Sequence, residues 1–216
     1  MSRMIDLFER TALLALEKQD KFGRVVSEHL VDLDLVSGTA RFGTDIELPF
    51  KVLGTTSDNT LTWLWAWSEA QDQIPENVAV AARELRAWGE REGLPEFIEP
   101  EVDLGRGDGQ MLSMVAVEAA QASCFYRDPY EGGALYFLIS GKEIDAQPSL
   151  DAERLAFHLR ELSEEYEINP RNALLAYFTA KELSSREEGT AVLCRLGNGE
   201  PFKMEFDDQG RLVREA

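Results

Sequence analysis

The chain has 216 residues, of which 44% are hydrophobic, and its 40 acidic against 22 basic side chains give a net charge of −18. That much apolar sequence can build a core, so a disordered chain is excluded. The excess of carboxylates repels phosphate backbones and anionic lipid heads, which argues against nucleic-acid and membrane-surface binding. The same charge either favours a basic protein partner or serves solubility alone.

The N-terminal stretch and the cysteines bear on location. The first apolar segment is interrupted by charged residues such as Glu9, Arg10 and Lys18, so it is typical of an amphipathic helix and not of an export signal. No apolar run approaches the roughly 20 residues that span a bilayer. Without an export signal, Cys124 and Cys194 are expected to stay reduced. We therefore expect a bacterial-type cytoplasmic protein.

The first elements in chain order are a helix and a strand hairpin. Residues 4–22 place apolar side chains on one broad helical face, and Gly23 is expected to end the helix. Residues 31–35 alternate between apolar and acidic side chains, which is the period of a half-buried strand. Ser37 and Gly38 are typical of a two-residue hairpin turn.

Two further strands follow this hairpin. Residues 46–52 alternate again, but Pro49 cannot donate a hydrogen bond to a neighbouring strand, so we expect an edge strand or a bulge there. The polar stretch TTSDN is a turn signal, and TLTWLWAWS, residues 60–68, is the next strand. The first part of the chain is therefore predicted to be a helix followed by about four antiparallel strands.

The tryptophans of this last strand are the strongest signal for a site. Trp63, Trp65 and Trp67 share one face with Leu61, because side chains alternate along a strand. The side chains on the other face are small and partly apolar, which favours a central strand. Indoles of this size are expected to be covered. They either form core beneath a helix or wall a pocket for a small apolar or planar ligand, together with Trp88 from the next helix.

The middle of the chain predicts two helices with a loop between them. Pro75 suits the first turn of one helix and Gly93 its end. The stretch near 97–108 is rich in Pro, Gly and acidic residues, and it is the best candidate for an internal boundary. Asp108 can cap the second helix. SCFYR and ALYFLISG then have the pattern of a strand hairpin.

The C-terminal part predicts two more helices and then strands. The helices are expected at about 150–166 and 169–183, because Asn169-Pro170 is a typical start for the second. Residues 189–216 predict three short strands with turns at GNGE and DDQG. The fold class is thus α+β, an antiparallel sheet that can be curved and that packs against helices. Residues 1–216 are expected to form a single compact unit.

Few groups suited to catalysis are present. The two histidines, His29 and His158, are expected at the surface or at its boundary. The chain has no G-x-S-x-G, Cys-x-x-Cys or His-x-x-x-His sequence, and we expect no cofactor. Asp32 and Asp34 project from one strand face, where two carboxylates can hold Mg²⁺ or Ca²⁺ and assist a hydrolysis. The solvated face of an antiparallel strand explains this pair equally simply.

An acidic cluster occurs at the end of a predicted helix. It is made of Glu161, Glu164, Glu165 and Glu167. Carboxylates at that end oppose the helix dipole, so the cluster is locally unfavourable. It is either a docking patch for a basic partner or a solvated face.

The run LGTTSDNTLTWLWAWS, residues 53–68, resembles the signature of a bacterial family defined by a domain of unknown function, in which a Leu-Gly segment leads into a Thr-Trp-x-Trp-x-Trp strand. The later stretch EAAQASCFYRDPYEGGALYFLISG is similar to an aromatic hairpin of that family, so the resemblance spans roughly residues 1–140. Family members often continue with Ala-Asn after the last Trp, whereas this chain has Ser68-Glu69 and lacks any polar role of that Asn. The resemblance implies no activity.

These observations favour a non-enzymatic cytoplasmic protein that binds a basic protein partner, as an immunity protein binds a toxin or nuclease. The alternative is a small-molecule-binding domain whose pocket is walled by Trp63, Trp65, Trp67 and Trp88.

Overall fold

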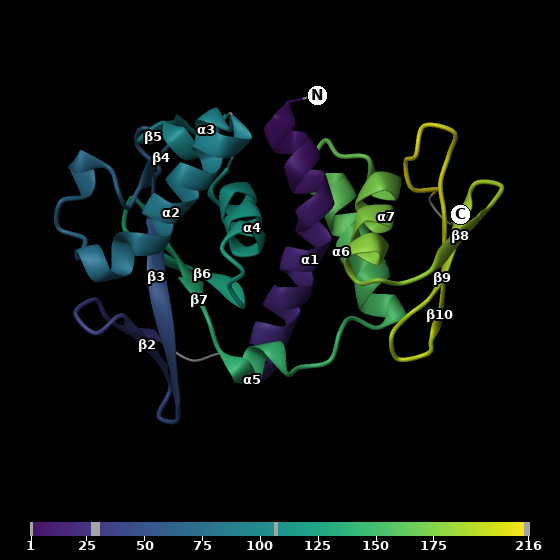
Figure 1. The fold of residues 1–216 in the computed structure, drawn as a ribbon, viewed down its shortest axis with the longest axis horizontal. Helices are drawn as coiled ribbons and strands as arrows, with labels where there is room; N and C mark the ends of the chain where they lie inside the picture. The colour runs from purple at the N-terminus through teal and green to yellow at the C-terminus, as the bar shows by residue number, and fades with distance from the viewer. Residues whose placement is uncertain (1, 27–30, 106–107, 214–216) are drawn as a thin grey trace. The chain divides into compact units, whose positions relative to one another are not determined.

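A computed structural model describes residues 2–26, 31–105 and 108–213 (Figure 1). It confirms the predicted α+β class, because antiparallel sheets pack against helices. The chain divides into two compact units, one made of residues 1–20 and 148–216 and the other of residues 21–147. The stretch near 97–108, where the sequence placed a candidate boundary, falls inside the second unit.

The helices of the first unit begin with α1 (Arg3–Val25), which belongs to this unit as far as Asp20. This helix runs through Gly23, so the prediction that Gly23 ends it was wrong. A glycine ends a helix by taking a positive φ, and Gly23 does not have one. In the helix interior Gly23 only makes the helix less stable, by roughly 1 kcal/mol relative to alanine.

The other two helices of this unit are α6 (Ala152–Glu165) and α7 (Pro170–Ala180). Both begin at side-chain caps, of which Asn169 was predicted and Asp151 was not. Asp151 accepts a hydrogen bond from the backbone of Arg154, and the side chain of Asn169 accepts one from Asn172 N at 3.1 Å. The side chains of Leu155, Leu159 and Leu162 form the buried stripe of α6.

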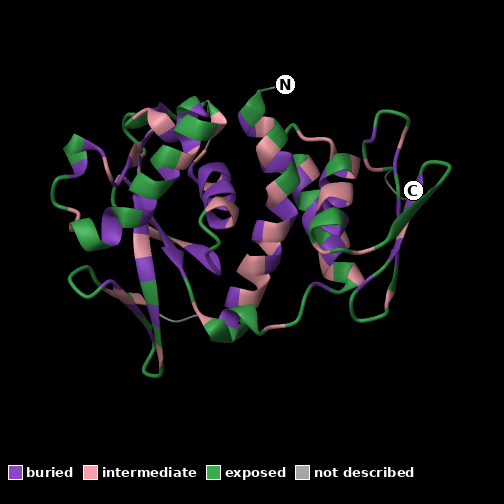
Figure 2. Ribbon diagram, in the orientation of Figure 1, coloured by how far each residue is buried: buried purple, intermediate pink, exposed green. Residues whose placement is uncertain are grey.

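A three-stranded sheet completes the first unit, in the order β10-β9-β8. Its strands are β8 (Ser185–Glu188), β9 (Ala191–Arg195) and β10 (Pro201–Glu205). The sheet packs on α7 through the rings of Phe202 and Phe178, whose centroids are 5.9 Å apart. β8 is exposed along its whole length (Figure 2), which is why its sequence has no alternating pattern and was not predicted. Beyond the DDQG turn the predicted last strand is only an isolated bridge between Phe206 and Leu212.

The second unit is built on a seven-stranded antiparallel sheet. Its strands are β1 (Val31–Asp34), β2 (Thr39–Phe42), β3 (Ile46–Ser57), β4 (Thr62–Trp65), β5 (Glu101–Asp103), β6 (Cys124–Tyr130) and β7 (Gly133–Ile139). The long β3 is central, because it pairs with β2, β4 and β7. The sheet curls about β3, where the register with β7 shifts between Val52 and Gly54.

Two turn predictions in this sheet need correction. Pro49 does not mark an edge strand or the bulge, because β3 is an interior strand and its register shift lies at Val52. The β3–β7 ladder instead stops at Phe50, next to the proline nitrogen that cannot donate. The β1–β2 hairpin has a four-residue loop and not a two-residue turn, since Asp34 pairs with Thr39.

Helices cover the sheet of the second unit. The main ones are α2 (Glu76–Glu92) and α4 (Gly109–Ala119), and the shorter ones are η1 (Glu69–Gln71), α3 (Pro95–Ile98) and α5 (Lys142–Asp145). The predicted ends of the two long helices are confirmed. Gly93 takes a φ of 65° after α2, and Asp108 accepts a 2.6 Å hydrogen bond from Met111 N at the start of α4. In the described part of the chain, no helix has the length and apolar character needed to cross a membrane.

Candidate functional site

Trp63 and Trp65 belong to the core of the second unit. Both side chains are 0% exposed. Their ring centroids are 5.2 Å apart, and Trp65 also packs on Phe97 at 5.0 Å. The indole of Trp65 donates a 2.9 Å hydrogen bond to the carbonyl of Glu96. The indole faces that the sequence offered to a ligand are therefore covered by protein.

The shared face predicted for this strand breaks after Trp65, because β4 ends there. Trp67 lies in the following turn, half-buried, with the guanidinium carbon of Arg86 4.5 Å from its ring centroid. Trp88 on α2 is also half-buried and packs edge-on against Phe97 at 5.1 Å. Trp65 and Trp88 thus meet through Phe97, Trp63 joins them through Trp65, and Trp67 is held separately by Arg86.

Leu61 departs most from the predicted face. It has a φ of 53° and its side chain is 63% exposed. Branched residues rarely take a positive φ, because the left-handed conformation costs roughly 1–2 kcal/mol. Leu61 is the last residue of the turn between β3 and β4, so the strain is stored at one end of the sheet.

Three turns meet at this end of the sheet and form what we call the sheet-end surface, residues 58–61, 103–105 and 130–132. Backbone hydrogen bonds join them, from Asp58 N to Gly132 O and from Leu104 N to Leu61 O, each 2.9 Å long. The hydroxyl of Tyr130 donates to the Thr56 carbonyl at 3.2 Å. These contacts fix the three turns relative to one another.

The sheet-end surface combines apolar and acidic groups. Leu61 and Tyr130 are both large and exposed, the latter at 51%. The exposed carboxylates of Asp58, Asp103 and Glu131 lie in the described residues 58–61, 103–105 and 130–132, which include no lysine, arginine or histidine, and Arg106 lies outside the described residues. Exposed apolar side chains rimmed by polar residues are typical of an interaction site.

Asp32 and Asp34, the weak metal candidates, lie exposed on β1. Arg41 Nη1 is 3.7 Å from Asp32 Oδ2. Hydrogen bonds from the side chain of Ser37 and from the backbone of Ser37 and Val36 lower the pKa of the Asp34 carboxyl group. Within residues 2–26, 31–105 and 108–213, no three His, Cys, Asp or Glu side chains gather in a way that could hold a metal ion.

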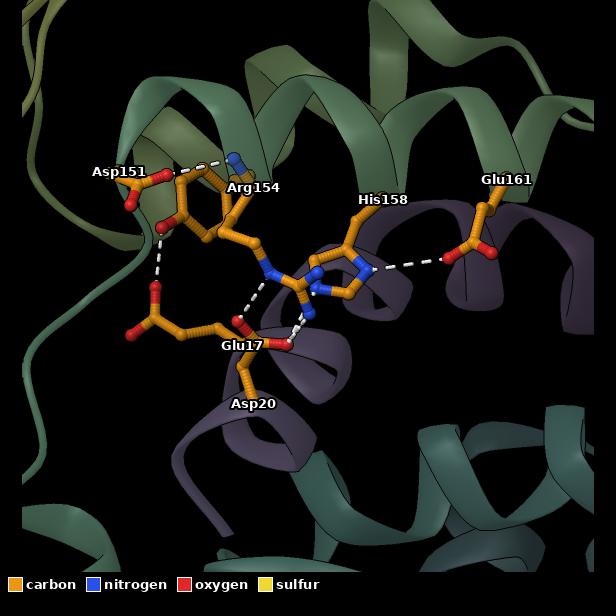
Figure 3. Close-up of polar contacts among 7 residues, drawn as sticks. Glu17, Asp20, Asp151, Arg154, His158 and Glu161 are labelled. Atoms are coloured by element: carbon orange, nitrogen blue, oxygen red, sulfur yellow. Dashed lines mark hydrogen bonds and ion pairs between the residues drawn. The ribbon is translucent and has the colours of Figure 1, made fainter. Parts of the chain in front are cut away.

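A polar network in the first unit centres on Asp20 of α1 (Figure 3). Arg154 donates to it through two nitrogens, with Nε 3.0 Å from Oδ2, and His158 Nε2 lies 3.0 Å from Oδ1. The other ring nitrogen of His158 faces Glu161 at 3.7 Å. Burial alone would raise the pKa of Asp20, but the hydrogen bonds from Arg154 and His158 outweigh it, so this pKa is lowered.

A second carboxylate of α1, Glu17, is only 3% exposed. Tyr177 on α7 donates its hydroxyl to Glu17, and Lys181 Nζ donates to the other carboxylate oxygen at 2.8 Å. Burial and this hydrogen bond raise the pKa of Tyr177. The same lysine also donates to Ser149 Oγ at 3.1 Å. Glu17 thus ties α7 to α1 as Asp20 ties α6 to it.

The sequence missed this network. His158 was expected at the surface or its boundary, but only 6% of it is exposed. Its ring nitrogen Nε2 forms a hydrogen bond with Asp20, which is 138 positions away in sequence. His29 lies outside the described residues. The described polar contacts of His158 are with carboxylates and not with a hydroxyl or thiol, so the geometry favours holding helices together over nucleophilic catalysis.

The four glutamates of the acidic cluster predicted at the end of α6 lie in two different places. Glu161 faces His158, whereas Glu164, Glu165 and Glu167 line a groove of about 720 Å³. Ile168, Leu212 and Val213 form apolar parts of the same groove, and Arg160 and Arg211 also line it. Because two arginines offset two of its three carboxylates, this groove is less selective for a basic partner than the sheet-end surface is.

Residues 5–142 match the family model described as "Family of unknown function (DUF6882)". No curated protein and no solved structure matches the chain. The matched residues include β1–β7 and the sheet-end surface, whereas α6, α7 and β8–β10 lie beyond the match. The match confirms the predicted resemblance to a domain of unknown function, and since it covers more than half of the sequence, the chain belongs to the family DUF6882.

Proposed function

We propose that this chain is a non-enzymatic binding protein that captures a basic protein partner through the sheet-end surface. The observation that carries the proposal is Leu61, an exposed branched residue at a φ of 53° among three carboxylates. Strained backbone at an exposed position points to a function, because packing does not explain it. A leucine in contact with a partner buries apolar surface that offsets this strain.

The charge of the surface selects the class of partner. Asp58, Asp103 and Glu131 present carboxylates beside Leu61 and Tyr130. A complementary face would carry lysine or arginine around an apolar recess that accepts Leu61. The net charge of −18 adds long-range attraction, which raises association rates with a basic protein.

An immunity-like role fits this chemistry, since a basic toxin or nuclease is a partner that fast electrostatic capture would neutralise. We place the encounter in a bacterial cytoplasm. Cys124 and Cys194 are buried thiols that no disulfide joins to each other, as in proteins of reducing compartments. The alternative, a planar ligand on the tryptophans, is less favoured because Trp63 and Trp65 are completely buried.

Affinity capture from an extract of the source cells tests the proposal. Immobilised wild-type chain is compared with Leu61→Gly and with the charge variant Asp58→Asn/Glu131→Gln. Val36→Gly is the matched control, because Val36 is also an exposed apolar turn residue of the same unit. Captured proteins are identified by mass spectrometry.

The expected result is a basic protein that the wild type and Val36→Gly retain and that the two other variants lose. Its affinity, measured by titration calorimetry, should fall as salt rises from about 50 to 300 mM, because exposed charges are screened. Capture of the same proteins by all four chains would contradict the proposal, as would a captured partner that is acidic.

A further inference from the structure

The outward face of the three-stranded sheet of the first unit carries a row of cations. Arg186 on β8 pairs with Leu193 on β9, which pairs with Lys203 on β10. Directly opposed residues of antiparallel strands share a face, so two cations flank one leucine. Arg195 lies two residues farther along β9 on the same face, with Nη1 donating to the Gly199 carbonyl at 2.7 Å.

This face lines a groove of about 650 Å³. The lining contains the three cations and no carboxylate, in a chain with 40 acidic and 22 basic residues. Leu193 and Pro201, which pairs with Arg195 on the same face, give it an apolar floor. Glu188 and Glu205 lie beside this lining, so the face as a whole carries three cations and two carboxylates.

Two of the cations are held in place by neighbours on their own strands. Arg186 Nη2 lies 3.0 Å from Glu188 Oε1, and Lys203 Nζ lies 2.6 Å from Glu205 Oε1. The hydrogen bond to Glu205 raises the pKa of Lys203, which keeps the ammonium charged. Both pairs are exposed, and exposed pairs contribute little to stability. An incoming anion can therefore replace the carboxylates at small cost.

We propose that this groove binds a small amphipathic anion, meaning one carboxylate, phosphate or sulfonate group on an apolar or aromatic body. The anionic group would contact Arg186 or Lys203. The strands of these two residues are separated by β9 and lie roughly 10 Å apart. The body would rest on Leu193 and Pro201. The volume lies within the roughly 300–1,000 Å³ of small-ligand sites. A polyanion is excluded, since the net charge of −18 repels it.

The test uses two fluorescent probes with the same ring system on the full chain. One is 8-anilinonaphthalene-1-sulfonate, and the other is N-phenyl-1-naphthylamine, which lacks the sulfonate. The sulfonate probe should bind with one-to-one stoichiometry and more tightly than the neutral probe. Dodecanoate and dodecyl phosphate should displace it and so report which anionic group is preferred, whereas inorganic phosphate, without an apolar body, should not.

The variant Arg186→Gln/Lys203→Gln should weaken sulfonate binding about tenfold and leave neutral-probe binding unchanged, because only the charged contact is lost. Lys203→Gln alone should weaken it by an intermediate factor, and circular dichroism melting checks that both variants fold. Arg83→Gln/Arg91→Gln, which removes two exposed cations of α2, is the matched control and should bind as the wild type does. The proposal is overturned if both probes bind alike, if the double variant retains full affinity, or if inorganic phosphate competes as well as dodecyl phosphate.

Discussion

Leu61 keeps a left-handed backbone conformation although its exposed side chain buries little surface in exchange. Glycine adopts this conformation without steric cost, so it would suit the turn better if folding were the only requirement. The hydrogen bond that the Leu61 carbonyl accepts from Leu104 N uses the backbone and would survive a change of side chain. Stability of the fold therefore favours glycine at position 61, whereas the proposed binding favours leucine.

Leu61→Gly should stabilise the second unit by about 0.5–1 kcal/mol, because relief of the strain exceeds the added chain entropy of glycine. Tryptophan fluorescence during thermal unfolding measures this, since all four tryptophans lie in that unit. Val36→Gly has no positive φ to relieve and should not raise the midpoint. A lower midpoint for Leu61→Gly would show that the leucine serves folding.

Asp20 is the residue on which the polar network of the first unit depends. Its pKa is lowered in the folded protein, so folding is favoured by this carboxylate above its unfolded pKa of 3.8. The contribution is lost as pH falls from about 3.8 through the lower folded pKa. His158 and Arg154 would be left without this acceptor if the carboxylate were removed.

Asp20→Asn should therefore cost about 2 kcal/mol at pH 7, below the roughly 3–5 kcal/mol of a fully buried pair because Arg154 is partly exposed. The difference from wild type should shrink below pH 4. Urea unfolding followed by far-ultraviolet circular dichroism at several pH values measures it, with Asp208→Asn as an exposed control in the same unit. A pH-independent difference would contradict the assigned role of the carboxylate.

At the scale of elements, the position of β4 depends on how closely it approaches β3. A Cβ atom at Gly54 would lie 2.3 Å from the carbonyl oxygen of Leu64 and 2.9 Å from the indole of Trp63. Only glycine allows this approach, so Gly54 lets the tryptophan strand pair with β3 while its two indoles remain in the core.

Gly54→Ala should destabilise the second unit by roughly 2–4 kcal/mol, because backbone or indole has to move to accept the methyl group. Tryptophan fluorescence under urea unfolding is the measurement. Gly23→Ala is the control in the same unit, since a Cβ there meets no atom within 4 Å and its φ is not positive. Equal stability of Gly54→Ala and Gly23→Ala would mean that β4 does not lie where the structure places it.

At the scale of the whole molecule, the features that sequence predicts are those with local causes. The ends of α2 and the caps at Asp108 and Asn169 follow from the chemistry of a few adjacent residues, and the structure confirms them. The alternation of the tryptophans continues to Trp67, yet the chain turns after Trp65, which alternation alone cannot show. β8 was missed because it is exposed throughout.

The candidate site needed tertiary structure for the same reason. Its carboxylates are in three turns that are far apart in sequence and that hydrogen bonds of Asp58, Leu61 and Tyr130 bring together. Composition predicted an acidic protein with a basic partner, but not where the two would meet. In sequence, Leu61 looked like a member of the tryptophan face, and only its φ and exposure distinguish it.

Hydrogen–deuterium exchange of the chain, free and saturated with the captured basic partner, shows whether the partner binds the sheet-end surface. We expect slower exchange in residues 58–61, 103–105 and 130–132, with no comparable change in the Val36 turn. Protection confined to the groove around residues 160–170, or to β8–β10, would show that the partner binds elsewhere and would contradict the proposed function.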